Sequence, residues 1–152
     1  MNSEELQKIK ELLYSKHSSS IIAEIKKMNS TLHLHIYAAN YNWNSGFEVP
    51  TAILVNENCD FGTGLLMFYR ADGYRMFEST DAVFHSSLGE WKEFINNLHD
   101  RILDNSFHNK KFSFTPPPLT KVQIFKLSKL NPSIPDIFLY KSPGDDIEIP
   151  VL

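Results

Sequence analysis

The sequence predicts a mainly α-helical protein: a compact array of five or six short helices and an irregular C-terminal segment with room for a few short strands. Apolar residues recur at spacings of three and four, residues that cap helices precede these runs, and seven of the eight prolines follow Thr115. The 152 residues, 42% apolar and 22% charged, suit one domain. We expect residues 1–115 to form a helical core and residues 116–152 to form a Pro-rich extension packed on it.

The first three helices are expected before residue 42. Ser3 is a suitable N-cap for the first, which has an apolar stripe at Leu6, Ile9, Leu12 and Leu13. A second amphipathic helix follows the break at residues 18–20 and extends to Met28. Residues 31–40 alternate like a strand, but they also fit a helix that starts at Ser30–Thr31, and their two alanines favour the helix.

The middle of the chain contains two further helices separated by turns. Residues 42–46 form a turn by composition, and Pro50 fits the first turn of a helix that ends near Asn56. Asp60 is an N-cap for the next helix, which Asp72 and Gly73 end. The two glycines at positions 62 and 64 weaken this helix by roughly 1 kcal/mol each, and the close approach of a neighbouring helix would compensate for them.

The clearest helix follows the capping box formed by Ser87 and Glu90. Its apolar face consists of Trp91, Phe94, Ile95, Leu98 and Ile102, and it extends toward residue 105. Residues 112–119 form a Pro-rich connector. Residues 119–130 fit either a helix or a strand, and prolines divide the rest.

The bulk properties exclude some classes of function. The net charge of −3 is mild and the Lys and Arg residues are scattered, so no nucleic-acid partner is expected. No apolar run reaches the roughly 18 residues of a membrane span, so no membrane partner is expected. Cys59 is the sole cysteine, which suits a cytoplasmic protein without a disulfide framework.

Three constellations could support chemistry, and each has a simpler explanation. His33 and His35 could bind one metal ion from a strand, together with His99 and a carboxylate, but on a helix they point about 200° apart. Cys59 precedes a helix N-terminus, yet it reads better as a small buried hydrophobe. No pair of acidic residues has a spacing that brings two carboxyl groups into one pocket. We therefore predict no enzyme activity, no cofactor and no metal.

Residues 34–73 resemble an uncharacterised, mainly bacterial family known as domain of unknown function 4274. That pattern is an L-H-x-x-A helix, then Y-N-W-D-D-G-F-x-x-P, then N-x-x-C-D-x-x-T-A-L-x-x-F-Y-x-A-D-G. The matching residues are Leu34, His35, Ala38, Tyr41, Asn42, Trp43, Gly46, Phe47, Pro50, Asn56, Cys59, Asp60, Thr63, Leu65, Phe68, Tyr69, Ala71, Asp72 and Gly73. The chain departs from the pattern at Asn44 and Ser45, which replace an acidic pair, and at Gly64, which replaces Ala. The resemblance implies no known activity.

The size and style of the chain are similar to those of immunity proteins from bacterial toxin–immunity and contact-dependent inhibition systems. The expected function is non-enzymatic, stoichiometric binding of a cognate protein toxin, with a nuclease as one candidate class. The candidate partner-binding residues are Glu78, Asp81, Asp100, Asp104, Asp145, Asp146, Trp43 and Tyr74. The alternatives are a helical adaptor or homodimerisation module and a small metal-dependent hydrolase that uses histidine and carboxylate.

Overall fold

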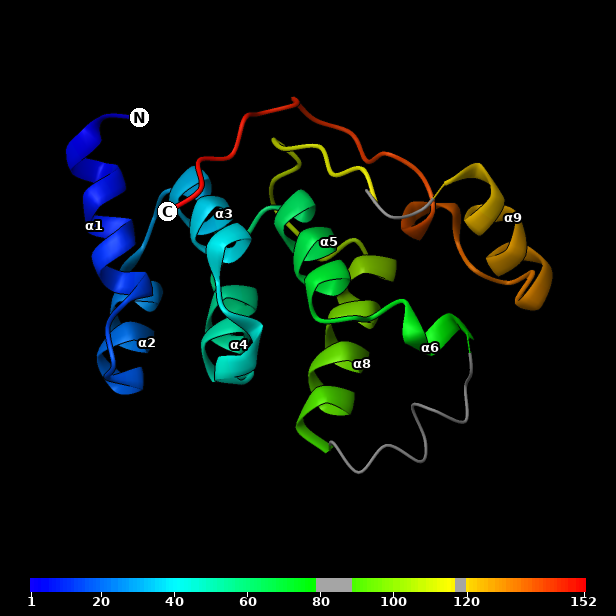
Figure 1. Ribbon diagram of the computed structural model, residues 1–152, viewed down its shortest axis with the longest axis horizontal. Coiled ribbons are helices and arrows are strands. Elements are labelled where there is room, and N and C mark those ends of the chain that lie inside the picture. The colour runs from blue at the N-terminus through cyan, green and yellow to red at the C-terminus, as the bar shows by residue number, and fades with distance from the viewer. Residues whose placement is uncertain (79–88, 117–119) are drawn as a thin grey trace.

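The computed structural model describes residues 1–78, 89–116 and 120–152, and nothing is described of the Glu78 side chain. The predicted mainly helical class is confirmed: the described residues form eight α-helices and no strand. The helices lie side by side along the long axis of the molecule, from α1 at one end to α9 at the other (Figure 1). The C-terminal segment runs back along one side, so that the C-terminus lies beside α3, toward the same end of the molecule as the N-terminus (Figure 1).

The first three helices match the predicted segments, with different details at their starts. Helix α1 (Ser3–Leu13) is capped by Asn2 rather than by Ser3, because the Asn2 side chain accepts from the Glu5 N–H in a capping box. Helix α2 (Ser18–Lys27) includes the three serines that we expected to form a break before it. Helix α3 (Thr31–Asn40) is capped by Ser30, so the preference for a helix over a strand is confirmed here.

The central helices follow the predicted turns. The turn expected at residues 42–46 contains a 3-10 turn, η1 (Trp43–Ser45), and ends at Gly46, whose φ of 95° suits glycine. Helix α4 (Glu48–Val55) carries Pro50 in its first turn. Helix α5 (Phe61–Arg70) is capped by Asp60 as predicted, and Asp72 with φ 64° follows its end.

The remaining elements complete the array. They are α6 (Arg75–Glu78), α8 (Gly89–Leu103), α9 (Lys121–Leu130) and the 3-10 turn η2 (Asp136–Phe138). The predicted apolar face of α8 is confirmed, since all five of its residues are buried. Ser87 lies outside the described residues, so its capping box stays a prediction. Residues 121–130 form a helix with a capping box of Thr120 and Gln123, which resolves the alternative left open for this segment.

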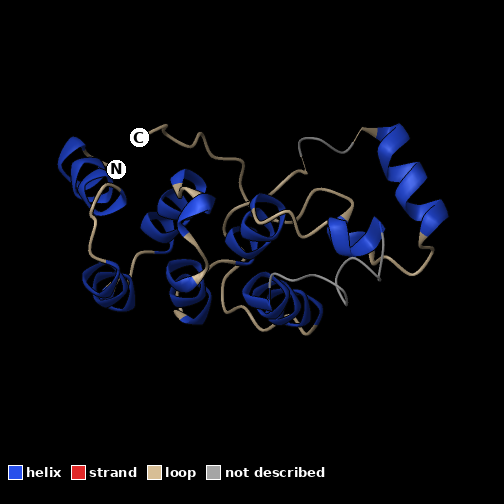
Figure 2. Cartoon of the chain, turned by 60° about the horizontal axis from the view of Figure 1, so that its bottom comes forward, coloured by secondary structure: helices blue, strands red, loops and turns tan. Residues whose placement is uncertain are grey.

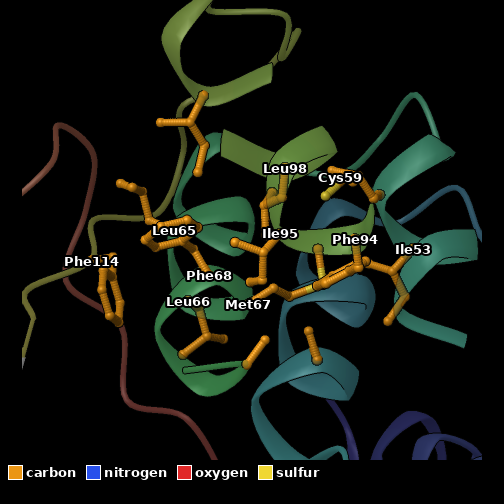
Figure 3. Packing of buried hydrophobic residues seen from close by; sticks show 14 of the residues in the cluster. Ile53, Cys59, Leu65, Leu66, Met67, Phe68, Phe94, Ile95, Leu98 and Phe114 are labelled. Carbon is orange, nitrogen blue, oxygen red and sulfur yellow. The ribbon is translucent and has the colours of Figure 1, made fainter. Parts of the chain in front are cut away.

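The core is centred on α5. Every residue from Phe61 to Phe68 is buried, and α5 packs against both α3 and α8. Figure 3 shows Leu65 and Met67 of α5 close to Ile95 and Leu98 of α8. Helix α2 packs on α4, and α1 packs on α3, which extends this core toward the N-terminus.

The strands expected in the C-terminal segment do not form in the described residues. That segment takes part only in the parallel bridge between Phe112 and Asp145, and a second isolated bridge joins Asp60 to Asn109. The backbone N–H groups of Ser113 and Asp145 donate to the carbonyls of Asp145 and Lys111, which ties residues 111–113 to the returning tail. Asn40 binds the tail further on, through the Pro150 carbonyl and the Leu152 N–H.

Candidate functional site

The polar residues of the family pattern are mostly turned inward. Asp60 is fully buried, and its carboxylate accepts backbone N–H groups from Gly62 (2.9 Å), Lys111 (2.6 Å) and Phe112 (3.2 Å). The side chain therefore caps α5 and also holds the segment that follows α8. Its role is structural, because every oxygen is engaged by the protein's own backbone.

His35 and Thr63 form a second buried contact, between α3 and α5. The distance from His35 Nδ1 to Thr63 Oγ1 is 2.7 Å, and the imidazole lies against the Phe112 ring at 4.8 Å between centroids. Burial lowers the pKa of His35 to about 4, so the ring is neutral at physiological pH. This neutral, hydrogen-bonded imidazole locks the two helices together.

The three histidines of the metal hypothesis lie in different surroundings. His33 lies 3.8 Å from Glu5 of α1, whereas His35 points into the core and His99 stacks on the Phe138 ring at 5.2 Å. Among the residues that the structure describes, no group of three or more His, Cys, Asp or Glu side chains is arranged to hold a metal ion.

Cys59 is 2% exposed, and burial raises the pKa of its thiol to about 12; Arg101 opposes this shift and Asp60 adds to it. The thiol is therefore protonated and out of reach of a substrate. It packs as a small hydrophobe beside Ile53 and Phe94 (Figure 3).

An acidic stripe runs along the outer face of α8, and we define it by five residues. All five are exposed and follow one another at helical spacings of three and four: Glu90, Glu93, Asn97, Asp100 and Asp104. At a rise of 1.5 Å per residue the stripe is about 21 Å long. Arg101, one of the cationic residues of α8, points elsewhere, donating to the Leu54 carbonyl and lying 5.1 Å from the Phe107 ring. The Asp100 carboxylate lies 3.4 Å from His99 Nδ1.

The N-terminal half of the stripe borders a groove of about 400 Å³ between α4 and α8. Among the residues that the structure describes, its lining consists of acidic, aromatic and uncharged polar side chains, with no basic one: Phe47, Glu48, Thr51, Glu90, Glu93, Phe94 and Asn97. The Trp43 ring packs behind the two aromatic residues of the groove, with its centroid 6.4 Å from that of Phe47 and 6.0 Å from that of Phe94. The buried Trp43 N–H has no hydrogen-bond partner in the described part of the chain.

The predicted partner-binding residues are distributed over several places. Asp100 and Asp104 lie on the stripe, and half-buried Trp43 lies behind the groove. Tyr74 does not face a partner: it is 8% exposed and donates to the Phe138 carbonyl at 2.7 Å, because the aromatic core around Phe68 encloses its ring. Asp81 lies outside the described residues, as does the Glu78 side chain.

Asp145 and Asp146 lie away from α8, on the returning tail. The Asp146 carboxylate accepts from Lys141 Nζ at 2.8 Å and from the Ser113 hydroxyl. The hydrogen bond from Lys141, followed by that from Ser113, holds the pKa of Asp146 below its ordinary value. These two aspartates therefore help to hold the tail against residues 111–113.

Sequence reasoning missed three glutamates of the groove and the stripe, Glu48, Glu90 and Glu93. The signal for Glu90 and Glu93 was present, since an acidic or amide residue recurs at positions 90, 93, 97, 100 and 104 of the strongest predicted helix. The polar face of that helix was as regular as its apolar face.

The chain was compared with protein families, curated proteins and solved structures. Residues 29–103 match the model of the family described as Domain of unknown function (DUF4274), which extends the resemblance seen at residues 34–73. No curated protein and no solved structure matches the chain significantly. No described helix is long and apolar enough to cross a bilayer. Residues 29–103, which include the Ser30 cap of α3 and extend to the end of α8, are the part of the chain that matches this family.

Proposed function

We propose that this chain is a non-enzymatic binding protein that holds a basic protein partner against the acidic stripe of α8. The partner that fits best is a cognate bacterial toxin, and the function is that of a cytoplasmic immunity protein. The acidic stripe and the aromatic groove beside it are the observation on which the proposal rests.

The stripe is not explained by the stability of its own helix. Glu90 lies in the first turn of α8, where a negative charge favours the helix dipole, but Asp100 lies in the last turns and Asp104 follows the end. Carboxylates near a helix C-terminus are unfavourable by a few tenths of a kcal/mol. A row of carboxylates that continues to this end suits an external cation.

The groove suits a cationic side chain from such a partner. A Lys or Arg inserted beside Phe47 and Phe94 would meet two aromatic rings and the carboxylates of Glu48, Glu90 and Glu93. A cation over an aromatic face is stabilised by about 0.5–2 kcal/mol, depending on its desolvation. The groove would therefore act as an anchor, and the rest of the stripe would provide electrostatic complementarity.

A nuclease is the class of toxin that this surface fits. Proteins that act on nucleic acids present Lys and Arg to the phosphate backbone. A rigid row of carboxylates about 21 Å long would compete with the nucleic acid for such a surface. By covering it, the chain would block access of the nucleic acid without needing a reaction of its own.

The positions of the reactive side chains also support a binding function. His35, Cys59 and Asp60 are each at most 2% exposed and engaged with the protein's own groups. A substrate in solution cannot reach them. The family pattern is thus accounted for by the scaffold, and a partner would meet the outer surface of α8.

The test uses the purified product of the gene that neighbours this one, titrated into the chain by isothermal calorimetry at low and high salt. We expect a one-to-one complex that weakens with salt, loss of any nuclease activity of that product on binding, and protection of cells that express it. A triple substitution on the stripe, Glu93→Gln, Asp100→Asn and Asp104→Asn, should weaken binding about tenfold.

The matched control removes the same number of charges from other faces, with Glu11→Gln, Glu57→Gln and Glu148→Gln, all exposed residues. It should bind within about twofold of the unmodified chain. Absence of both binding and protection would refute the immunity function. Equal weakening by the two triple variants would refute the assignment of the stripe.

A further inference from the structure

Helix α9 has an outer face on which apolar and basic side chains alternate. Its apolar residues are well exposed, Val122 at 61%, Phe125 at 66% and Leu130 at 69%. Lys121, Lys126 and Lys129 are exposed between them, and the helix contains no acidic residue. None of these lysines has an ion-pair partner in the described residues.

The fold leaves this face uncovered. Helix α9 lies at one end of the molecule, where it packs mainly against α6 (Figure 2). It is anchored by Leu127, which is 7% exposed, and by the half-buried Ile124. One short helix here exposes several large apolar side chains among lysines. Such a surface indicates that another molecule covers it.

The positive charge of this face is complemented by another surface of the same chain, the acidic stripe. Three lysines over nine residues of α9 occupy about 12 Å, and three carboxylates from Glu93 to Asp104 occupy about 16 Å. Two of the exposed large hydrophobic residues, Val55 at 60% and Leu103 at 46%, lie on the two helices that carry the groove and the stripe. The stripe and the outer face of α9 thus carry opposite charges, and exposed apolar side chains lie elsewhere on the helices that carry the groove and the stripe.

We infer that the outer face of α9 docks on the acidic stripe of a second copy of this chain. The lysines of α9 pair with Glu93, Asp100 and Asp104, and the contact removes Phe125 and Val122 of α9 from water. Two such contacts related by a two-fold axis give a closed dimer, and a contact that does not close gives a growing chain. The inference does not rest on the toxin partner, because this chain alone takes part. The two occupants of the stripe exclude each other, so self-association is expected of the free chain and a bound toxin displaces the second copy.

The composition of α9 favours a protein surface over a bilayer. A helix that lies in a membrane presents its most apolar face to the lipid. In α9 the apolar Ile124 and Leu127 are turned toward the protein, and the outer face intersperses its apolar residues with lysines. Such a mixed face is complementary to carboxylates with apolar neighbours.

The experiment is sedimentation equilibrium of the full chain over a range of concentrations, at low and high salt. We expect a mass above the 17.5 kDa of one chain, reverting toward it at high salt. Two charge-reversal variants isolate the contact: Lys121→Glu/Lys126→Glu/Lys129→Glu on α9, and Glu93→Lys/Asp100→Lys/Asp104→Lys on α8. Each alone should self-associate at least about tenfold more weakly, and their equimolar mixture should associate again.

Circular dichroism establishes that both variants fold, and Phe125→Ser tests the apolar part without changing charge. A chain that stays monomeric at the highest concentration and low salt would overturn the inference. So would a mixture that fails to associate while both variants are folded. Binding of the monomeric chain to phosphatidylserine vesicles, lost in the α9 variant, would assign the face to a membrane surface and equally overturn it.

Discussion

Replacing Asp60 with Ala tests whether the buried pattern residues determine the fold. The substitution removes the acceptor of three backbone N–H groups, those of Gly62, Lys111 and Phe112. Asp60 is fully buried, so no water reaches its place without rearrangement. The cap of α5 and the attachment of residues 111–112 are lost together.

The magnitude follows from the groups left without a partner. Loss of an Asp N-cap costs about 1 kcal/mol. A buried N–H without an acceptor costs about 1–3 kcal/mol, and the Lys111 N–H, which is only partly buried, falls at the lower end. We expect Asp60→Ala to lower the free energy of unfolding by about 4 kcal/mol, a large part of the 5–15 kcal/mol of a typical domain.

Asp60→Asn should give an intermediate loss. The amide oxygen can take the position of Oδ2 and still accept from Gly62 and Phe112. The amide NH₂ then faces the Lys111 N–H, so that two donors oppose each other where the carboxylate made a 2.6 Å hydrogen bond. We expect a loss of about 2 kcal/mol, since one acceptor is removed and the cap is kept.

Chemical denaturation followed by tryptophan fluorescence and circular dichroism measures these losses. The control is Asp104→Ala, an exposed aspartate on the stripe, which should stay within about 0.5 kcal/mol of the unmodified protein. A loss below about 1 kcal/mol for Asp60→Ala, or equal losses for Ala and Asn, would show that the carboxylate is not the acceptor these three groups depend on.

The remaining predictions concern two glycines and one histidine. Gly62→Ala should destabilise more than Gly64→Ala, because its Cβ would lie 2.0 Å from the Phe112 carbonyl oxygen, whereas at Gly64 the 2.6 Å contact is with the end of the Phe107 side chain. Thermal unfolding ranks the two, and the reverse order would contradict the packing described. His35 stays neutral in the folded protein down to about pH 4, while in the unfolded chain it takes up a proton below about pH 6.5. Its contribution to the free energy of unfolding is therefore fully present above pH 6.5 and is lost as the pH falls toward 4. The loss approaches about 3 kcal/mol, and unfolding curves of His35→Gln should lack this part of the pH dependence.

Local signals in the sequence were enough to place most helices. Ser30 and Asp60 are capping residues immediately before apolar runs, and both cap helices in the structure. The five apolar residues of α8 repeat over about three turns, and all five are buried. Such signals operate within a turn or two of the chain, which is why they are readable without knowledge of the tertiary structure.

The contacts between distant segments were out of reach of the same reasoning. The glycines of α5 were expected to accommodate a neighbouring helix, but Phe107 and Phe112, in the irregular segment after α8, approach them instead. Asp60 was expected as a cap, but its bonds to Lys111 and Phe112 span about fifty residues. A spacing rule says which residues share a face and leaves open which segment covers it.

Exposure was the other quantity that the residue types did not determine. Tyr74 and Trp43 were considered together as aromatic partner-binding residues, yet Tyr74 is enclosed by the core and half-buried Trp43 lies behind the groove. Tyr and Trp are common both in cores and at interfaces, so their identity does not separate the two. The carboxylates were more informative, because unpaired acidic residues are rarely buried.

The family pattern and the proposed binding surface differ in what a substitution costs. Buried residues such as Asp60 and His35 hold two or three segments at once, so changing either one reduces the stability of the whole fold. Exposed stripe residues such as Glu93 and Asp100 can change for less than about 0.5 kcal/mol each. A scaffold built in this way keeps its helices in place while the charges on the outer face of α8 are free to vary. The pattern at residues 34–73 therefore specifies how the helices pack, and the proposed partner surface on α8 lies outside those residues.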